Sequence, residues 1–264
     1  MLKKAHSRTD LKNNFLNGRI PTETHFSDLI DSMVNRQDDG LSKDDENGLI
    51  LSASKSTRKL ITLFDSIDQL KPFFYIEKDE RKDEKKSAGL RLNPYNELDE
   101  SGKEKKSFFF DVNGSMGIGK RSHQDYSLDV NGFAAMQGRV GTFVQDKVAA
   151  DGKWHTIIDK LDNCQAFEVM ARTGKKTTGK YSILHAYALS AFGRSSSKIR
   201  RTCAYNGFFW NKIGIRWKSK GIHNYALQLR TNSNYGADIF IDYKVTRLWD
   251  DEKFLSNDHF YQHK

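Results

Sequence analysis

A glycine-rich segment between residues 108 and 132 contains the residue pattern most suggestive of a chemical role. In FFFDVNGSMGIGKRSHQDYSLDVNG, Gly114, Gly119 and Lys120 almost complete the pattern GxxxxGK[ST]. Such a loop cradles phosphates with backbone N–H groups, its lysine contacts the phosphates, and its hydroxyl reaches a magnesium ion at the start of a helix. Arg121 stands where the hydroxyl is required, and the following residues predict a strand instead of a helix. The segment therefore predicts a glycine-rich β-turn and no nucleotide site.

The same segment contains Asp-Val-Asn-Gly twice, at residues 111–114 and 129–132. Each copy follows an apolar residue, and Asn-Gly is typical of tight β-turns. Two copies are fewer than a solenoid needs, so we expect neighbouring chains to supply the missing β-structure. The repeat predicts a β-structured collar or shaft over residues 108–150 of a homotrimer.

No catalytic or metal-binding set is visible in the sequence. His155, His185 and His223 have no second His or Cys at zinc spacing. Cys164 and Cys203 show neither metal spacing nor a disulfide framework, and we expect free thiols. We therefore expect no metal, no cofactor and no enzymatic activity. Carboxylates that hydrolyse glycans pair in space and not in sequence, so a polysaccharide-processing enzyme is the alternative.

Electric charge divides the chain into two parts. Of 43 basic and 34 acidic residues, residues 1–150 hold 24 of each, which leaves 19 basic and 10 acidic in residues 151–264. No acidic residue occurs between Glu168 and Asp238. One-sided charge raises the local concentration of anions and favours an anionic partner. The cations assigned to this partner are Arg200, Arg201, Lys212, Arg216, Lys218 and Lys220.

Aromatic residues are interleaved with these cations. Tryptophan and tyrosine rings stack on sugars, while arginine and lysine bind carboxylate, phosphate or sulfate. Two predicted turns, CAYNGFFWNKIG and RTNSNYGAD, combine aromatic, amide and basic groups and indicate a site for an anionic surface glycan. The predicted ligand-binding residues are Tyr205, Asn206, Trp210, Arg230, Asn232, Asn234 and Tyr235. For each aromatic residue the alternative is burial in the core. A nucleic acid is a further alternative for the anionic partner. It ranks below the glycan, because no nucleic-acid-binding motif accompanies the charge.

Short apolar runs predict that β-strands position these residues. From Gly48 onward the runs are NGLILSAS, KLITLFDS, PFFYIEKD, AGLRLNP and KSFFFDVNG. From Asp151 to Asp250 they are WHTIIDKL, AFEVMART, YSILHAYALSAF, KIRRTCAY, NKIGIRWKS, YALQLRTNS and DIFIDYKVTRLW. The run SILHAYALSAF fits a strand or a helix. The pattern predicts a mainly β protein, with a β-rich middle region at residues 41–107 and a basic antiparallel β-sandwich at residues 151–264.

Two short helices are predicted before the strands. Thr9 is the predicted N-cap of the first helix, which ends at Gly18. Pro21 and Thr22 open the second, whose apolar residues recur at helical spacing. Helices this short need a packing partner. We therefore expect residues 1–40 to form a helical attachment segment, followed by an acidic linker over residues 37–48.

Two stretches resemble known proteins. GSMGIGKRSHQDYSLDVNG resembles segments that introduce the trimeric β-shaft of bacteriophage tail fibres. LKNNFLNGRIPTETHFSDLIDSMVNRQDDG resembles the opening of tail-fibre-like proteins from phage-like contractile injection systems. The resemblance covers residues 9–40 and 108–141. It implies an elongated homotrimer that attaches to a baseplate or fibre subunit through residues 9–36 and adheres to a target cell through its C-terminal domain.

The absence of long apolar runs predicts where the protein is made and where it works. No run approaches the roughly 18 residues of a membrane span, and the N-terminus MLKKAHSRTDLKNN has no apolar signal-peptide core. We expect a protein that is made in the cytoplasm without a signal peptide, is not inserted into a membrane, and works on an extracellular particle.

Overall fold

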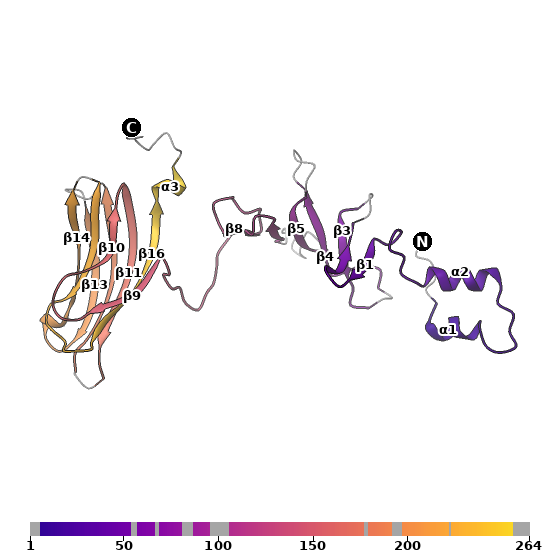
Figure 1. Ribbon diagram of the computed structural model, residues 1–264, viewed down its shortest axis with the longest axis horizontal. Coiled ribbons are helices and arrows are strands. Elements are labelled where there is room, and N and C mark those ends of the chain that lie inside the picture. The colour runs from indigo at the N-terminus through magenta and orange to yellow at the C-terminus, as the bar shows by residue number, and fades with distance from the viewer. Residues whose placement is uncertain are drawn as a thin grey trace. The chain divides into compact units, whose positions relative to one another are not determined.

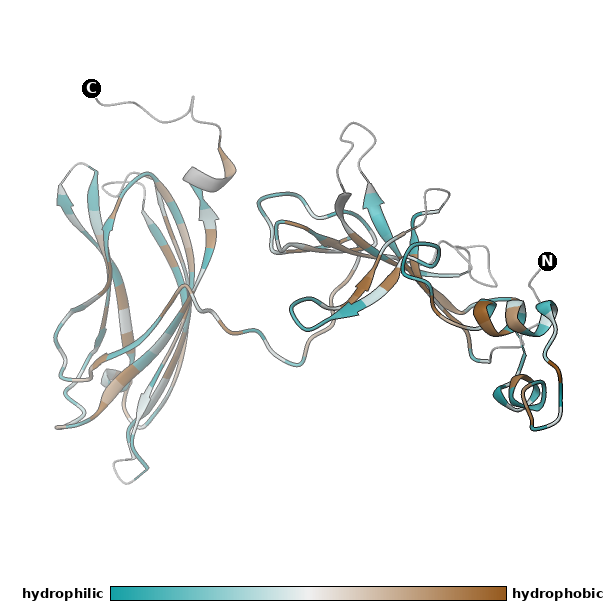
Figure 2. Cartoon of the chain, turned by 45° about the vertical axis from the view of Figure 1, so that its right-hand side comes forward, coloured by the Kyte–Doolittle hydropathy of each residue, from teal (hydrophilic) through white to brown (hydrophobic). Residues whose placement is uncertain are grey.

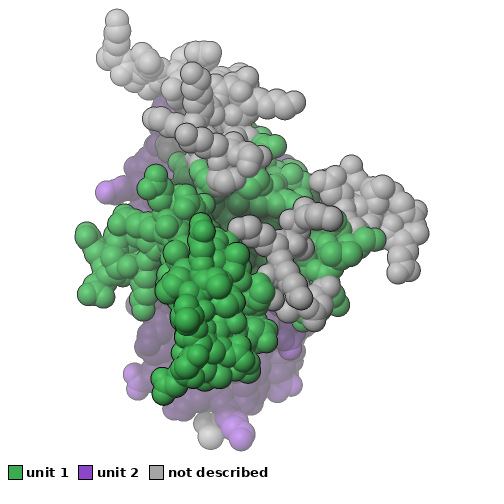
Figure 3. Space-filling model, turned by 90° about the vertical axis from the view of Figure 1, so that its right-hand side faces the viewer, with its two compact units in different colours: residues 1–134 green, residues 135–264 purple. Residues whose placement is uncertain are grey.

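The computed structural model describes residues 6–53, 57–66, 69–80, 87–95, 106–176, 179–191, 197–221 and 223–255. The chain is mainly β, as predicted, and divides into unit 1, residues 1–134, and unit 2, residues 135–264 (Figure 1; Figure 3). The predicted boundary at residue 150 is therefore corrected. Strand β9 (Val144–Ala149) pairs with β16 (Phe240–Asp250), so the predicted collar over residues 108–150 is split between the two units.

Unit 1 begins with helices α1 (Arg8–Asn13) and α2 (Glu23–Asp31). The N-cap of α1 is Ser7 and not Thr9. The hydroxyl of Ser7 accepts a hydrogen bond from the backbone N–H of Asp10 at 3.1 Å, and the Asp10 carboxylate accepts one from the backbone N–H of Ser7 at 3.1 Å. Asp10 completes this reciprocal box because it lies three residues after the cap. Helix α2 follows Thr22, as predicted.

Part of the predicted acidic linker is a β-hairpin. Strand β1 (Leu41–Asp44) pairs antiparallel with β2 (Gly48–Leu51). The Asp44 carboxylate accepts hydrogen bonds from the backbone N–H and the side-chain amide of Asn47, which closes the turn. The linker prediction is wrong here, because the acidic residue Asp44 closes a turn between two paired strands.

A six-stranded sheet in the order β3–β4–β5–β6–β7–β8 forms the rest of unit 1. All neighbours are antiparallel except β7 and β8, which are parallel. The strands are β3 (Lys59–Leu63), β4 (Phe74–Glu80), β5 (Ser87–Pro94), β6 (Phe108–Asp111), β7 (Met116–Ile118) and β8 (Leu128–Val130). The predicted middle region and the first part of the predicted collar thus share one sheet.

One face of this sheet is apolar across five strands, apart from Lys78. Alternate residues of a strand point to the same face, and the register aligns two rows on this face, separated by one row that belongs to the other face. The first row is Ile76, Leu92, Phe108, Ile118 and Val130, and the second is Lys78, Leu90, Phe110, Met116 and Leu128. We call these ten residues the apolar face. The row between them, on the opposite face, contains Glu77, Arg91, Phe109, Gly117 and Asp129.

The apolar face is only partly covered within the described part of unit 1. There, Leu11 and Tyr75 are the only buried hydrophobic side chains apart from Pro72. Phe110 is 40% exposed and Leu128 is 58% exposed. Figure 2 shows apolar, brown stretches on both the helices and the sheet of this unit. Unit 1 consequently lacks a hydrophobic core of its own among these residues.

The glycine-rich segment is part of the sheet. After β7, Lys120 forms an ion pair with Asp129 at 2.7 Å, and no helix follows in residues 119–127. The guanidinium of Arg121 donates two hydrogen bonds to the carboxylate of Asp79, at 2.8 and 2.6 Å. The lysine and arginine are thus engaged by carboxylates, and the segment forms strands and a turn, as predicted, where a phosphate loop would require a helix.

The two Asp-Val-Asn-Gly copies have different structures. In the first, Gly114 adopts a φ of +83° and donates its N–H to the carbonyl of Asp111 at 3.0 Å, which closes a hairpin between β6 and β7. In the second, Asp129 and Val130 belong to β8, which pairs in parallel with β7. The sequence repeat is not a repeated structural unit within one chain.

Unit 2 contains two antiparallel sheets (Figure 1). The five-stranded sheet has the order β13–β12–β11–β16–β9, and the three-stranded sheet has the order β10–β15–β14. The remaining strands are β10 (His155–Leu161), β11 (Cys164–Gly174), β12 (Tyr181–Ala191), β13 (Lys198–Asn206), β14 (Ile213–Gly221) and β15 (Asn224–Thr231). The run SILHAYALSAF is a strand as far as Ala191. Short elements η1 (Phe209–Asn211) and α3 (Asp251–Phe254), like β9, were not predicted.

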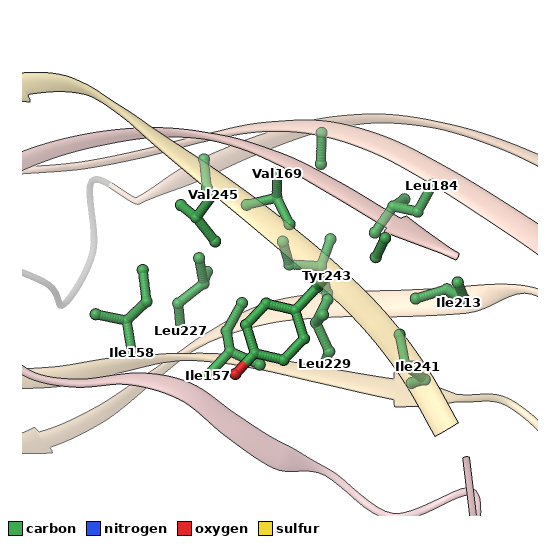
Figure 4. Packing of buried hydrophobic residues seen from close by; sticks show 14 of the residues in the cluster. Ile157, Ile158, Val169, Leu184, Ile213, Leu227, Leu229, Ile241, Tyr243 and Val245 are labelled. Carbon is green, nitrogen blue, oxygen red and sulfur yellow. The ribbon is translucent and has the colours of Figure 1, made fainter. Parts of the chain in front are cut away.

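Side chains from both sheets form one hydrophobic core. Val169 and Leu184 of the five-stranded sheet face Leu227 and Leu229 of the three-stranded sheet (Figure 4). All four are 0% exposed, and Phe167 is also 0% exposed. Each fully buried side chain of this size stabilises the fold by about 1.5–3 kcal/mol. Unit 2 is therefore held by sheets that cover each other.

The segment before β9 packs on unit 2. Arg139 pairs with the buried carboxylate of Glu168 at 2.5 Å, and His185 Nε2 lies 2.9 Å from the same carboxylate. The hydrogen bond to His185 and the charge of Arg139 hold the pKa of Glu168 below its usual range. Phe143 stacks on Phe167 with ring centroids 5.7 Å apart. These contacts fix residues 139–143 to the five-stranded sheet.

Candidate functional site

Four connections meet at one end of unit 2, which we call the loop end. They are residues 150–154, 175–180, 207–212 and 232–239, of which 177–178 are not described. Ala149 at the end of β9 lies opposite Phe240 at the start of β16, and Asn206 at the end of β13 lies opposite Tyr181 at the start of β12. Antiparallel pairing therefore brings segments distant in sequence to one edge.

Asn211 joins the connections at residues 207–212 and 232–239. It is 3% exposed, and its side-chain N–H donates to the carbonyl of Asn206 at 2.9 Å. The hydroxyl of Tyr235 donates to the backbone carbonyl of Asn211 at 2.5 Å, and that of Ser233 donates to the Asn211 side chain at 3.4 Å. Gly207 has a φ of +84°, and a Cβ there would lie 2.8 Å from Asn211 Nδ2. A hydrogen-bonded frame thus fixes both loops.

Three aromatic side chains stand exposed on this frame. Phe208, Phe209 and Trp210 are 64%, 66% and 42% exposed. The rings of Phe208 and Trp210 stack with centroids 4.5 Å apart, and Phe209 meets Trp210 edge-on at 4.9 Å. Exposed aromatic clusters of this kind are unusual on a protein surface without a binding role. Their stacking presents a rigid apolar platform.

Basic groups lie beside the platform. Lys212 Nζ lies 4.8 Å from the centroid of the Tyr205 ring, and Lys180 Nζ donates to the carbonyl of Asn234 at 3.1 Å. The backbone N–H of Asn232 donates to the carbonyl of Lys212 at 2.9 Å. The loop end therefore combines aromatic faces, amide groups and cations.

Six of the seven predicted ligand residues belong to this end. Tyr205, Asn206, Trp210, Arg230, Asn232 and Asn234 lie on or beside the two joined loops. Tyr235 is 4% exposed and part of the core, so we exclude it from the site. Burial raises the pKa of Tyr235 to about 12, which keeps its hydroxyl protonated as a donor. Tyr235 was predicted to lie in an exposed turn because Asn234 and Gly236 flank it in the sequence.

The predicted cations do not form a single patch. Arg200 and Arg201 are consecutive in β13, so their side chains leave on opposite faces. Lys220 of β14 forms an ion pair with Asp159 at 2.6 Å, and Lys218 is exposed two residues earlier. Lys212 lies at the loop end, whereas Arg216 lies against Trp154.

Sequence reasoning missed Trp154. It precedes β10, and the Cζ atoms of Arg216 and Arg230 lie 4.1 and 4.5 Å from its ring centroid. A single tryptophan between Lys153 and His155 carries no pattern. Only the pairing of β14 with β15 brings both arginines to it, because Gly214 opposite Arg230 leaves room for the ring.

No protein-family model, curated protein or solved structure matches the chain. Within the described part of the chain, no group of three or more His, Cys, Asp or Glu side chains is placed to hold a metal ion. Cys164 and Cys203 are free. Among the described helices, none has the length and apolar composition needed to cross a membrane.

Proposed function

We propose that this chain is a tail-fibre-like structural protein of a phage-like particle that binds an anionic glycan on a target-cell surface through the loop end. The observation that carries the proposal is the exposed stack of Phe208 and Trp210, fixed by buried Asn211 beside Lys212. A rigid aromatic face accepts a sugar ring at low entropic cost, and a neighbouring cation attracts an acidic substituent. In this proposal the two sheets of unit 2 are a receptor-binding β-sandwich.

Unit 1 supplies the argument for a homotrimer. Its apolar face spans β4 to β8 and is incompletely buried. Exposed apolar surface of this extent marks an interface in a soluble protein. Two further copies of the chain provide surfaces of the same width, so three apolar faces cover one another. The trimer would form an elongated fibre, with the collar region at its centre.

The helices are the proposed attachment segment. Phe26, Ile30, Met33 and Val34 of α2 and the residues after it are 50%, 61%, 58% and 64% exposed. Residues 9–36 therefore offer an apolar surface to a baseplate or fibre subunit. Attachment at this segment would place the protein on an extracellular particle and leave unit 2 to contact the target cell without catalysis.

Glycan binding is tested with the full chain and an immobilised polyuronate. The variant Trp210→Ala removes the platform, and we expect affinity to fall about tenfold, as for a central aromatic contact. Tyr187→Ala is the matched control, because Tyr187 is 43% exposed but lies on the outer face of the five-stranded sheet. Equal affinity of Trp210→Ala and the unsubstituted chain would contradict the proposal. Release of glycan fragments would instead establish a polysaccharide-processing enzyme.

A further inference from the structure

Two arginines share one tryptophan beside the loop end. Arg216 of β14 and Arg230 of β15 stack on Trp154, with Cζ atoms 4.1 and 4.5 Å from the ring centroid. A Cβ on Gly214 would lie 3.3 Å from Trp154 Cη2, so this glycine admits the ring to the sheet. The Oδ1 atom of Asn232, from the loop end, lies 3.5 Å from the same Cβ position. The cluster is therefore continuous with the loop end.

Hydrogen bonds hold the first arginine in place. The Nε–H of Arg216 donates to Gln228 Oε1 at 2.9 Å, and Gln228 Nε2 donates to Thr156 Oγ1 at 3.0 Å. Gln228 is 9% exposed, so this chain of side chains is partly protected from water. The Nε–H of Arg230 is buried and has no partner among the described residues. One guanidinium is thus fixed, and the other has an N–H group left to satisfy.

Neither arginine is neutralised within the described part of the chain. There, Arg121, Arg139 and Arg247 each form an ion pair with a carboxylate, those of Asp79, Glu168 and Asp250. Arg216 and Arg230 form no such pair with any described residue, and no acidic residue occurs between Glu168 and Asp238. Two like charges held against one ring attract an anion strongly. A stacked guanidinium also keeps its in-plane N–H groups available for oxygen acceptors.

We propose that Arg216 and Arg230, stacked on Trp154, form an oxyanion-binding subsite for the acidic groups of the glycan. Guanidinium groups bind carboxylate, sulfate or phosphate through paired N–H donors. The subsite would hold the charge of an acidic sugar while the platform of Phe208 and Trp210 holds a neighbouring ring. This inference rests on the proposed function for its ligand, whereas the affinity of the site for an oxyanion stands without it.

The test measures binding to the full chain by calorimetry. The probes are a glucuronate-containing oligosaccharide, its carboxyl-reduced counterpart and its O-sulfated, carboxyl-reduced counterpart. The variants are Arg216→Lys and Arg230→Lys, which keep the charge but remove the planar fork. We expect each variant to lose about tenfold in affinity for a charged oligosaccharide, as for a hydrogen bond to a charged group. The matched control is Arg172→Lys on the outer face of the five-stranded sheet, which should bind as the unsubstituted chain does.

The probes separate the sources of the oxyanion. Stronger binding of the glucuronate probe than of the sulfated probe assigns a carboxylate, and the reverse assigns a sulfate. Equal binding of the charged and reduced probes, or unchanged binding by both lysine variants, overturns the subsite. The chain could also bind duplex DNA, with a steep dependence on salt, and bind no glycan. If the same variants abolish that DNA binding, the glycan assignment is overturned in favour of nucleic acid.

Two further measurements keep the failures distinguishable. Inorganic sulfate titrated into the full chain should shift the Arg Nε–H resonances of Arg216 and Arg230 and leave that of Arg172 in place. Shifts of these two resonances without any glycan binding would support the subsite and contradict the proposed function. Glycan binding that needs Trp210 but neither arginine would support the proposed function and contradict the subsite. The variant Trp154→Phe retains an aromatic ring under the two arginines, so the fold should be kept. It should preserve most of the affinity for the charged oligosaccharide.

Discussion

The two units of this chain differ in how completely they bury their apolar side chains. In unit 2, a five-stranded and a three-stranded sheet cover each other, and Phe167, Leu184 and Leu227 are 0% exposed. In unit 1, a six-stranded sheet leaves Phe110 and Leu128 40% and 58% exposed. The number of strands therefore does not decide how completely apolar side chains are buried. A second apolar layer does.

The difference assigns different roles to the units. Because unit 2 has its own core, its loops can hold exposed aromatic side chains in a fixed geometry. Because unit 1 lacks one among the described residues, the proposed trimer would cover its apolar face with other copies of the chain. We infer that unit 1 is the assembly unit and that unit 2 is the recognition unit.

The largest expected effect concerns assembly. Ile118→Asp places a carboxylate in the middle of the apolar face, and burying an unpaired charge costs several kcal/mol. We expect trimers to be replaced by single chains in sedimentation velocity. Val112→Asp is the control, because Val112 is 70% exposed in the turn after β6 and lies outside the apolar face. Intact assembly of the Ile118 variant would show that this face is not the interface.

The next effect concerns the core of unit 2. Phe167→Ala removes a fully buried ring, and we expect the free energy of unfolding of unit 2 to fall by about 3–5 kcal/mol. Ile183→Ala, in β12 but 45% exposed, should cost less than about 1 kcal/mol. Calorimetric melting of both variants provides the measurement. A similar loss in both would mean that the two sheets do not share the core described above.

A smaller effect concerns the frame of the loop end. Asn211→Ala removes the donor to the carbonyl of Asn206, and the loss of one hydrogen bond costs about 0.5–1.5 kcal/mol. We expect faster amide hydrogen exchange in residues 207–212 and 232–236 and weaker glycan binding. Asn224→Ala, at the other end of β15, should change neither. Unchanged exchange in the Asn211 variant would contradict the role of this residue.

The smallest expected effect is a loss of stability of unit 2 at alkaline pH. Burial raises the pKa of Tyr225 and Tyr235 from 10.0 to about 12. In the unfolded chain both hydroxyls ionise at the lower value. The stability of unit 2 should therefore be complete below pH 10 and fall as pH rises from 10 through about 12. Tyr235→Phe should reduce this fall, as measured by denaturant unfolding at pH 9 and pH 11. Equal stability of the unsubstituted chain at both pH values would contradict the burial of these hydroxyls.

Local sequence patterns predicted most strands. The alternating run DIFIDYK contributes the start of β16 (Phe240–Asp250), where buried and exposed residues alternate, whereas YALQLRT is a strand that is buried on both faces from Tyr225 to Leu229. Strand β9 (Val144–Ala149) was missed because VQDKVA lacks a strong pattern, and it is defined by its pairing with β16. The cap of α1 was placed at Thr9 because Ser7 is recognisable only with Asp10 as its reciprocal partner.

The site was predictable in composition but not in arrangement. Asn206, Asn232 and Trp210 were found because amides, glycines and aromatics cluster in their turns. Their proximity depends on Asn211, which is buried and has no distinguishing sequence neighbours. Trp154 lies far in sequence from Arg216 and Arg230, and only strand register brings the three together.

The mass of the full chain in solution tests the central claim most directly. Light scattering at micromolar concentration, coupled to size-exclusion chromatography, should give three times the 30.3 kDa mass of one chain. That result is expected if two further copies complete the apolar face of unit 1, as we propose. A mass of 30.3 kDa, together with a cooperative melting transition of unit 1, would contradict the account.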